Sequence, residues 1–305
     1  MQLFLCSFYF SYSCKKSNTM IRILMFVLSF VIAFTAQAQK PKEKTLLWKI
    51  EGKNINAPSF LFGTYHMLCP EDFNIPDTVK TLIANSKQII FEIDLDDPQL
   101  TSKMMKGIKM KDGKKLKDFF SESDYDSIAG LFKKITGMSI NAFETYKPFL
   151  LVSMLYPKMM NCATIAFEKE LEKIAKNNHL EVKGLETIED QLNVFDKIPY
   201  NVQAEAVKKT LFGLEEGKEQ MKKMVEMYKS KDIRSMQASI NSDTDLGNYD
   251  KVLLSNRNKN WIAVIEKEIT SLPTFIAVGA GHLAGKKGVI YLLRKNGYQV
   301  TPVMY

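Results

Sequence analysis

Histidine is scarce in this sequence of 305 residues: the chain contains only His66, His179 and His282. A catalytic or metal site that uses histidine must therefore draw on these three residues. Cysteine is also rare, with four residues, which excludes a fold held by a dense disulfide framework. Because 46% of the residues are hydrophobic and 25% are charged, a disordered or collagen-like chain is excluded too, and a buried core is expected.

Several familiar signatures are missing. No Gly/Ser-rich or Pro-rich linker divides the chain, and no repeat of solenoid period occurs. The motifs H-E-x-x-H, G-x-S-x-G and G-x-G-x-x-G and the P-loop are absent. The formal net charge is +8, but acids and bases alternate and form no basic cluster with interleaved aromatic residues. Nucleic acid is therefore not expected as a partner.

The N-terminal segment has the pattern of a secretory signal peptide. Arg22 precedes a short apolar run, and an A-x-A cleavage site ends at Ala38. Met20 is the natural start of such a signal, so residues 1–19 are interpreted as an upstream extension. We therefore predict an N-terminal extension plus signal peptide at 1–38, and export to a periplasm or out of the cell. No stable membrane span is expected after cleavage, because the apolar run is too short.

Two cysteines, Cys69 and Cys162, follow the predicted signal peptide. In an exported protein they could form a disulfide. Neither has a histidine in local register, which favours a structural role over a nucleophilic one.

The two ends of the chain have the pattern of strands, and the middle has the pattern of helices. Between about 100 and 270, Lys, Glu, Met and Leu dominate at helical spacing. We predict an α/β (α+β) fold with one domain over 39–305. Its central mixed β-sheet is built from the N- and C-terminal segments, and the helical segment is a large insertion. The predicted strands, the first two forming a hairpin, are Thr45–Ile50, Ser59–Gly63, Gln88–Ile93, Glu181–Leu185, Thr274–Val278 and Gln299–Val303.

Some helix boundaries are also indicated by capping residues. Ser121 and Thr187 are each followed by acidic residues and mark two helix starts. Apolar residues at helical spacing predict helices over 200–214 and 218–229. Another helix is predicted over 283–296, because a glycine follows it and a strand begins soon afterwards.

Two of the three histidines share one local context. One apolar run reaches Gly63 and another reaches Gly279, and His66 and His282 each follow three residues later. Glycine permits a sharp turn at a strand end, and open α/β sheets place their ligands beyond such ends. A single G-x-x-H is a weak motif that a structural histidine explains, but its duplication points to a joint site. His179 lies at a polar helix end and is interpreted as a surface residue.

Four charged residues are candidates for the same site. Glu92 interrupts a buried strand, where a charge needs a partner, unless the strand already ends in solvent there. Asp94 lies on the same face of that strand. Glu186 follows a strand directly, but it could instead complement the dipole of the next helix. Arg257 could steady a carboxylate or an oxyanion, or form an ordinary surface ion pair.

Two histidines and a carboxylate are a ligand set that holds a divalent metal with open positions. Such a metal activates water and polarises a carbonyl. The residue types therefore predict a metal at His66, Glu92 and His282. A second carboxylate, Glu186 or Asp94, could take the proton from the water.

The sequence around these candidates resembles the TraB/GumN family. The matching blocks are Leu61-Phe62-Gly63-Thr64-Tyr65-His66, Phe91-Glu92-Ile93-Asp94, Gly184-Leu185-Glu186-Thr187, Arg257-Asn258 with Trp261, and Val278-Gly279-Ala280-Gly281-His282-Leu283. The resemblance covers most of residues 45–305 and implies a mixed sheet with a helical insertion. The animal branch of the family, the TIKI proteins, comprises metal-dependent peptidases that use these motifs with manganese or cobalt. By resemblance, His66, Glu92 and His282 inherit the metal or catalytic role.

These observations predict an exported metal-dependent hydrolase of the peptidase type, with a peptide or protein substrate. The metal is divalent, and Mn, Co and Zn all remain open. Glu186 and Arg257 would support the water and the charge of the transition state. The alternative is an exported binding or accessory protein without turnover, related to a peptide, a polysaccharide or haem. In that case the histidines would be ligand contacts or structural residues. No oligomeric state is predicted.

Overall fold

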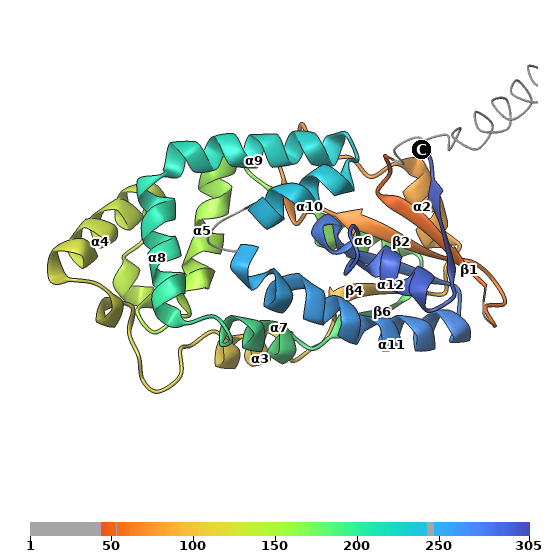
Figure 1. The fold of residues 1–305 in the computed structure, drawn as a ribbon, viewed down its shortest axis with the longest axis horizontal. Coiled ribbons are helices and arrows are strands. Elements are labelled where there is room, and N and C mark those ends of the chain that lie inside the picture. Colours follow the sequence, from red (N-terminus) through yellow and green to blue (C-terminus); the bar gives the residue numbers. More distant parts are fainter. Residues whose placement is uncertain (1–43, 53, 243–246) are drawn as a thin grey trace, which may run out of the picture. The chain divides into compact units, whose positions relative to one another are not determined.

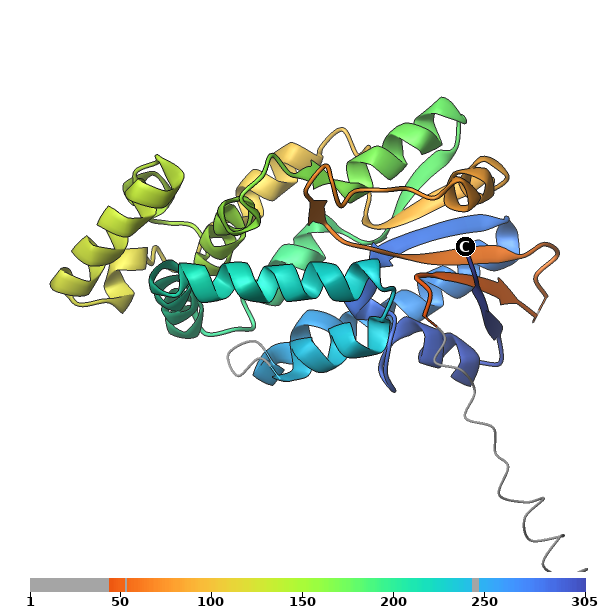
Figure 2. The same ribbon diagram turned by 90° about the horizontal axis from the view of Figure 1, so that it is seen from above.

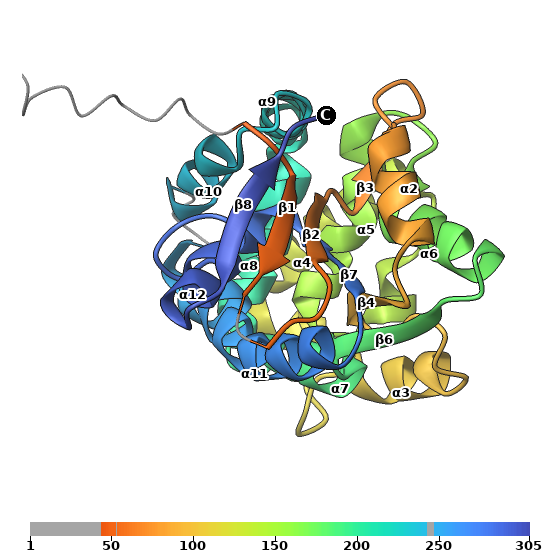
Figure 3. The ribbon, with the colours of Figure 1, turned by 90° about the vertical axis from the view of Figure 1, so that its right-hand side faces the viewer.

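A computed structural model describes residues 44–52, 54–242 and 247–305, and the predicted signal peptide at 1–38 lies outside them. The centre is a six-stranded β-sheet in the order β6-β4-β7-β2-β1-β8, as Figure 3 shows. All six predicted strands are present. The strands are β1 (Leu47–Glu51), β2 (Ser59–Thr64), β4 (Gln88–Ile93), β6 (Glu181–Glu186), β7 (Thr274–Gly279) and β8 (Gln299–Val303).

The sheet is mixed. Strands β6, β4, β7 and β2 run parallel to one another. β1 pairs antiparallel with both β2 and β8, so the predicted hairpin of β1 and β2 is confirmed. Five strands come from the two ends of the chain, whereas β6 comes from the middle segment and forms an edge of the sheet. The predicted mixed sheet with a helical segment inserted is therefore confirmed.

The central parallel strands are buried along most of their length. Every residue of β7 is buried, as are five of the six residues of β4. Helices α2 (Asp77–Ala84) and α6 (Phe167–Asn177) cover one face of the sheet, and α11 (Asn256–Ser271) and α12 (Val289–Lys295) cover the other (Figure 3). Parallel strands covered on both faces need apolar side chains throughout, which explains the almost unbroken apolar run of β4.

The helical segment between β4 and β7 has an apolar core of its own. Helices α4 (Glu122–Thr136), α5 (Pro148–Met160) and α8 (Tyr200–Phe212) enclose a separate cluster. It includes Phe132, Leu151 and Val207 and is distinct from the core around the sheet. Figure 2 shows these helices at the end of the ribbon away from the sheet. No helix in the described part of the chain is long and apolar enough to cross a membrane. Besides α4, α5, α6, α8 and α11, the segment contains α3 (Leu100–Gly107), α7 (Ile188–Phe195), α9 (Leu214–Lys229) and α10 (Ile233–Ser242).

The helix boundaries test the local predictions. Ser121 caps α4 by accepting a hydrogen bond from the Asp124 amide, and Thr187 forms a capping box with Asp190 at the start of α7, so both predicted starts are confirmed. The helix predicted over 283–296 is wrong in its first half, because α12 begins only after Gly288. Gly285 has a positive φ of 82° and Gly288 is extended, so the backbone before Val289 is not helical. A Cβ on Gly288 would lie 2.1 Å from a backbone oxygen of the same loop, so the loop requires glycine there.

A small ribbon and a disulfide connect the helical segment to the sheet. β3 (Met67–Leu68) pairs antiparallel with β5 (Ile165–Ala166). Cys69, directly after β3, is disulfide-bonded to Cys162, three residues before β5. The pairing predicted as one option for an exported protein is present, and both cysteines have a structural role.

Candidate functional site

The candidate residues meet at one edge of the sheet. Parallel strands carry their carboxyl ends to the same edge, which is where open α/β sheets bind ligands. His66 follows β2, Glu92 is the fifth residue of β4, Glu186 ends β6, and His282 lies in a short 3₁₀ turn, Ala280–His282, after β7. Figure 1 shows β4 and β6 beside α7 and α11.

Gly279, the last residue of β7, marks the point where three of these side chains converge. A Cβ placed on Gly279 would lie 3.2 Å from Glu92 Oε1, 3.6 Å from His66 Nε2 and 3.7 Å from His282 Cδ2. The two G-x-x-H segments therefore bring their histidines to a common point beside Glu92. Glycine at this position leaves the space between them open.

Glu92 is a buried carboxylate with a full set of donors. Its Oε1 accepts a hydrogen bond of 2.9 Å from the Gly279 amide. Its Oε2 accepts one of 2.7 Å from Arg257 Nη2 and one of 3.2 Å from Gln191 Nε2. Burial raises the pKa of Glu92, but the neighbouring His282 and Arg257 outweigh this and hold that pKa well below its usual range. Glu92 is thus an anion inside the protein, not a strand end in solvent.

Arg257, on α11, connects the two carboxylates of the site. Its guanidinium donates to Glu186 Oε1 from both Nε, at 2.9 Å, and Nη2, and the same Nη2 donates to Glu92. The group lies 4.9 Å from the centre of the Trp261 ring, a cation–π contact. Only 12% of the Arg257 side chain is exposed, so the alternative of an ordinary surface ion pair is wrong.

Glu186 is held from three directions. Besides Arg257, its carboxylate accepts hydrogen bonds from Trp261 Nε1 at 3.1 Å and from Gln191 Nε2 at 3.4 Å. Its side chain is 9% exposed. The contacts with Arg257 and Trp261 join β6 to α11, so Glu186 belongs to this buried network rather than serving only the dipole of α7.

His282 is buried and oriented by an amide. Its Nδ1 lies 2.6 Å from Asn258 Oδ1, and Asn258 Nδ2 donates to the Lys287 carbonyl at 2.9 Å. Because the amide nitrogen is used by that carbonyl, we assign the imidazole proton to Nδ1, which leaves a lone pair on Nε2. Nε2 lies 3.7 Å from Glu92 Oε1. Burial, with the positive charge of Arg257, lowers the pKa of His282 to about 3, so the ring is neutral at pH 7.

His66 has the opposite character. Its side chain is 67% exposed, and its Nδ1 lies 2.9 Å from Oε1 of Glu168, on α6. Desolvation by the surrounding protein lowers the pKa of His66, but the hydrogen bond and charge of Glu168 outweigh it and raise the pKa to about 9. With Nδ1 held by Glu168, Nε2 is the atom turned towards Gly279.

The side chains at this edge suit a divalent metal in type and in ring orientation. Metal-binding histidines commonly bond one ring nitrogen to a carboxylate or carbonyl oxygen and offer the other to the ion. His66 and His282 both have Nδ1 held in this way. Nε2 of His66 is directed to the shared point, and Nε2 of His282 lies 3.7 Å from Glu92 Oε1. In the described residues no three His, Cys, Asp or Glu side chains are close enough together to hold an ion as they stand. In this structure Arg257 forms a direct ion pair with Glu92.

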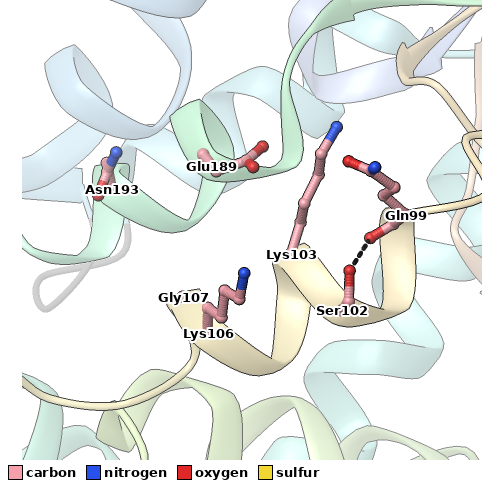
Figure 4. Close-up of a pocket in the computed structure, with 7 residues that line it drawn as sticks. All are labelled: Gln99, Ser102, Lys103, Lys106, Gly107, Glu189 and Asn193. Atoms are coloured by element: carbon pink, nitrogen blue, oxygen red, sulfur yellow. Dashed lines mark hydrogen bonds between the residues drawn. The ribbon is translucent and has the colours of Figure 1, made fainter.

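A separate pocket lies between α3 and α7, which follow β4 and β6. It has a volume of about 470 Å³ and shares no residue with the histidine site. Figure 4 shows polar side chains of both helices around it. The lining residues are Gln99, Ser102, Lys103, Lys106, Gly107, Glu189 and Asn193.

The comparison with known proteins agrees with the motifs at this edge. A model of the TraB/PrgY/gumN family matches residues 46–302. The chain belongs to this family. The predicted resemblance is confirmed, since the match contains both G-x-x-H segments and the residues between them.

Two curated proteins are similar to this member of the TraB/PrgY/gumN family. Metalloprotease TIKI2 of Danio rerio is 21% identical over 328 aligned positions, which cover 87% of this chain and 63% of that protein. Metalloprotease TIKI2 of Xenopus tropicalis is 22% identical, with 87% and 62% covered. The chain thus spans less than two thirds of the length of these relatives. No solved structure matches the chain.

Three further residues belong to the network although the sequence did not mark them as site residues. Gln191 and Asn258 stand near or inside blocks typical of the TraB/PrgY/gumN family, so a signal for them existed. Glu168 lies in the helical segment without any motif around it. Asp94, by contrast, accepts a hydrogen bond from the Asp96 amide in its own loop. Its pKa is raised to about 6, chiefly by burial, and its described bonds do not reach either histidine.

Proposed function

We propose that the chain is a metal-dependent hydrolase of the peptidase type. The observation that carries the proposal is the convergence of His66, Glu92 and His282 on one point at the carboxyl edge of the sheet. The two relatives named metalloproteases support the reaction class, although they are distant and longer than this chain.

His66, His282 and Glu92 would hold the metal. When bound, a divalent ion such as Mn, Co or Zn lowers the pKa of a water molecule and polarises a carbonyl oxygen. His282 is already neutral, and its Nε2 lone pair faces Arg257 Nη1 at 3.3 Å, so binding of the ion would have to displace that contact. His66 is cationic at neutral pH in this structure, so binding of the ion would have to release its proton.

Arg257 and Glu186 would assist from the side of α11 and β6. Arg257 keeps Glu92 and Glu186 as anions in a buried setting, and its Nη1 lies 3.3 Å from His282 Nε2. A guanidinium beside the reaction point would stabilise the negative charge that develops on a carbonyl oxygen. Glu186 would accept a proton from the attacking water.

Export is the second part of the proposal. The signal-peptide pattern at 1–38 supports it, and the Cys69–Cys162 disulfide suits an oxidising compartment. The substrate would then be a peptide or protein in a periplasm or outside the cell. Fractionation of cells expressing the full chain, with N-terminal sequencing of the product, tests this: uncleaved protein in the cytoplasm would contradict it.

The metal and peptidase activity are tested together with three alanine variants. Metal content and cleavage of an unbiased peptide mixture are measured for the wild type, His66→Ala, His282→Ala and the control His179→Ala, whose histidine is exposed after α6. We expect the first two variants to lose both properties and the control to keep them. Equal metal content and equal cleavage in all four proteins would overturn the proposal.

A binding or accessory protein without turnover is the second candidate. The observation that favours it is that Arg257 already bonds both Glu92 and Glu186, which reduces the charge available to a metal. In that case the wild type would bind a peptide, polysaccharide or haem without changing it. Absorbance spectroscopy and binding assays on the same four proteins distinguish this candidate from an enzyme.

A further inference from the structure

Glu168 connects the helical segment directly to His66. It is the second residue of α6, more than a hundred residues along the chain from the histidine. One oxygen, Oε1, accepts from Thr64 Oγ1 at 2.7 Å and lies 2.9 Å from His66 Nδ1. An acid in the first turn of a helix can simply complement the helix dipole. Sharing one oxygen between two side chains of the β2 end goes beyond that role.

The β3–β5 ribbon brings Glu168 to this position. Met67, the residue after His66, pairs with Ala166, and the Phe167 amide donates to the carbonyl of His66 itself at 3.1 Å. The backbone of His66 is therefore bonded to the residue just before Glu168. The distance between the two side chains is consequently set by backbone pairing rather than by their own flexibility.

Two anchors hold the ribbon on either side. The Cys69–Cys162 disulfide closes one end of it. At the other end Phe167 is 1% exposed and packs edge-on against Phe73, with ring centres 5.0 Å apart. A disulfide across a long loop and a buried aromatic ring both restrict movement of the segment they hold.

We propose that Glu168 is a positioning residue for His66. It holds the exposed imidazole with Nδ1 towards α6 and Nε2 towards Glu92, and the Cys69–Cys162 disulfide maintains this arrangement through the ribbon. The consequence for metal binding rests on the proposed function, whereas the restraint on the ring does not.

The first test measures the order of the His66 ring without metal. Relaxation of the ring Cε1–H group of ¹³C-labelled histidine gives an order parameter for each of the three histidines, with exposed His179 as internal reference. For comparison, rigid backbone groups have values of roughly 0.85 and flexible ones less than about 0.6. We expect Glu168→Ala to lower the value for His66 but not for His282. Glu168→Gln keeps an acceptor oxygen and should restore much of the order, and Glu170→Ala, on the same helix and paired only with Lys173 among its described bonds, should change nothing.

The second test adds the metal. Titration with cobalt(II) should show an affinity lower by about 10- to 100-fold in Glu168→Ala, the usual effect of losing a residue that orients a metal-binding histidine. If the wild type binds no cobalt, the proposed function fails, but the ring-order measurement still decides the role of Glu168. Unchanged ring order in Glu168→Ala would overturn the proposal whatever the metal does.

The disulfide is tested in the same way. Ring order is compared in the wild type, in dithiol-reduced wild type and in Cys69→Ser/Cys162→Ser, with circular dichroism to confirm that each is folded. Reduction should lower the order of His66 and leave that of His282 unchanged. If the folded reduced protein keeps the order of His66, the disulfide has no part in positioning and this element of the proposal is wrong.

Discussion

The two histidines of the site begin from the same local sequence and end in opposite states. Each follows a strand by the same G-x-x-H spacing, yet His66 is exposed and cationic whereas His282 is buried and neutral. The difference lies in their partners: a carboxylate, Glu168, bonds Nδ1 of one ring, and an amide, Asn258, bonds Nδ1 of the other. The local sequence therefore places each histidine at the end of a strand, and contacts with residues far away in the sequence decide its charge.

The buried network around His282, which includes Glu92 and Glu186, should depend most strongly on Arg257 for its stability. Arg257→Ala would leave Glu92 and Glu186 as buried anions without their cation, which typically costs about 3–5 kcal/mol of the free energy of unfolding. Urea unfolding measures the loss. Arg234→Ala, at an exposed position of α10, is the matched control and should cost little. A loss no greater than that of the control would show that Arg257 does not stabilise this network.

The position of the His66 ring should depend instead on the disulfide beside the β3–β5 ribbon. Cys69→Ser/Cys162→Ser removes a cross-link between residues 93 positions apart, and loss of such a bond typically costs about 2–5 kcal/mol. Stability is measured by urea unfolding of the oxidised wild type and the variant. The comparison between the two histidines predicts that the NMR signals of the His66 ring move in the variant while those of His282 stay. If the signals of both rings moved, the surroundings of His66 and His282 would be structurally coupled.

Exchanging the partners should make the two rings more alike. Asn258→Asp places a carboxylate beside His282 and is expected to raise its pKa from about 3, while Glu168→Gln removes one from His66 and is expected to lower its pKa from about 9. An opposite charge at this range shifts a pKa by roughly 1–3 units. NMR titration of the ring signals provides both values. Shifts in the reverse directions would refute the assignment of charge to the partners.

The pH dependence of stability should also differ between the two rings. The folded pKa of His66, about 9, exceeds the 6.5 of an unperturbed histidine. Its contribution to stability is therefore fully present below pH 6.5 and is lost as pH rises through about 9. The folded pKa of His282, about 3, lies below that of an unperturbed histidine, so stability falls as pH decreases from 6.5 towards 3. Urea unfolding across pH should therefore lose its alkaline slope in His66→Ala and part of its acid slope in His282→Ala. Parallel pH profiles for both variants and the wild type would contradict a cationic His66 and a neutral His282 in the folded protein.

The sheet was predictable because its signal is local. The run Gln88–Ile93 must be apolar wherever both faces of a parallel strand are covered, and it forms β4 with the predicted bounds. The prediction for 283–296 failed because apolar spacing does not report the positive φ of Gly285 or the extended backbone of Gly288. Strand identity depends on nearby residues, whereas that loop depends on the path of the chain in space.

The site was predictable only in part, for a related reason. Glu92 could be singled out because a charge in a buried strand needs a partner, and that partner is Arg257. Glu168 could not, because α6 carries other glutamates, Glu170 and Glu172, with similar surroundings in the sequence. Only the ribbon of β3 and β5 selects Glu168 as the one beside His66.

The sequence by itself determined the strands, the two strand-end histidines and the single charge in β4, since each depends on apolar periodicity or on the rarity of a residue type. The tertiary structure alone decided which ring is charged, which glutamate supports it and that Arg257 is buried between two carboxylates. The physical reason is that pKa values and hydrogen-bond partners depend on burial and on charges a few ångströms away in space, and these come from segments far apart in the chain.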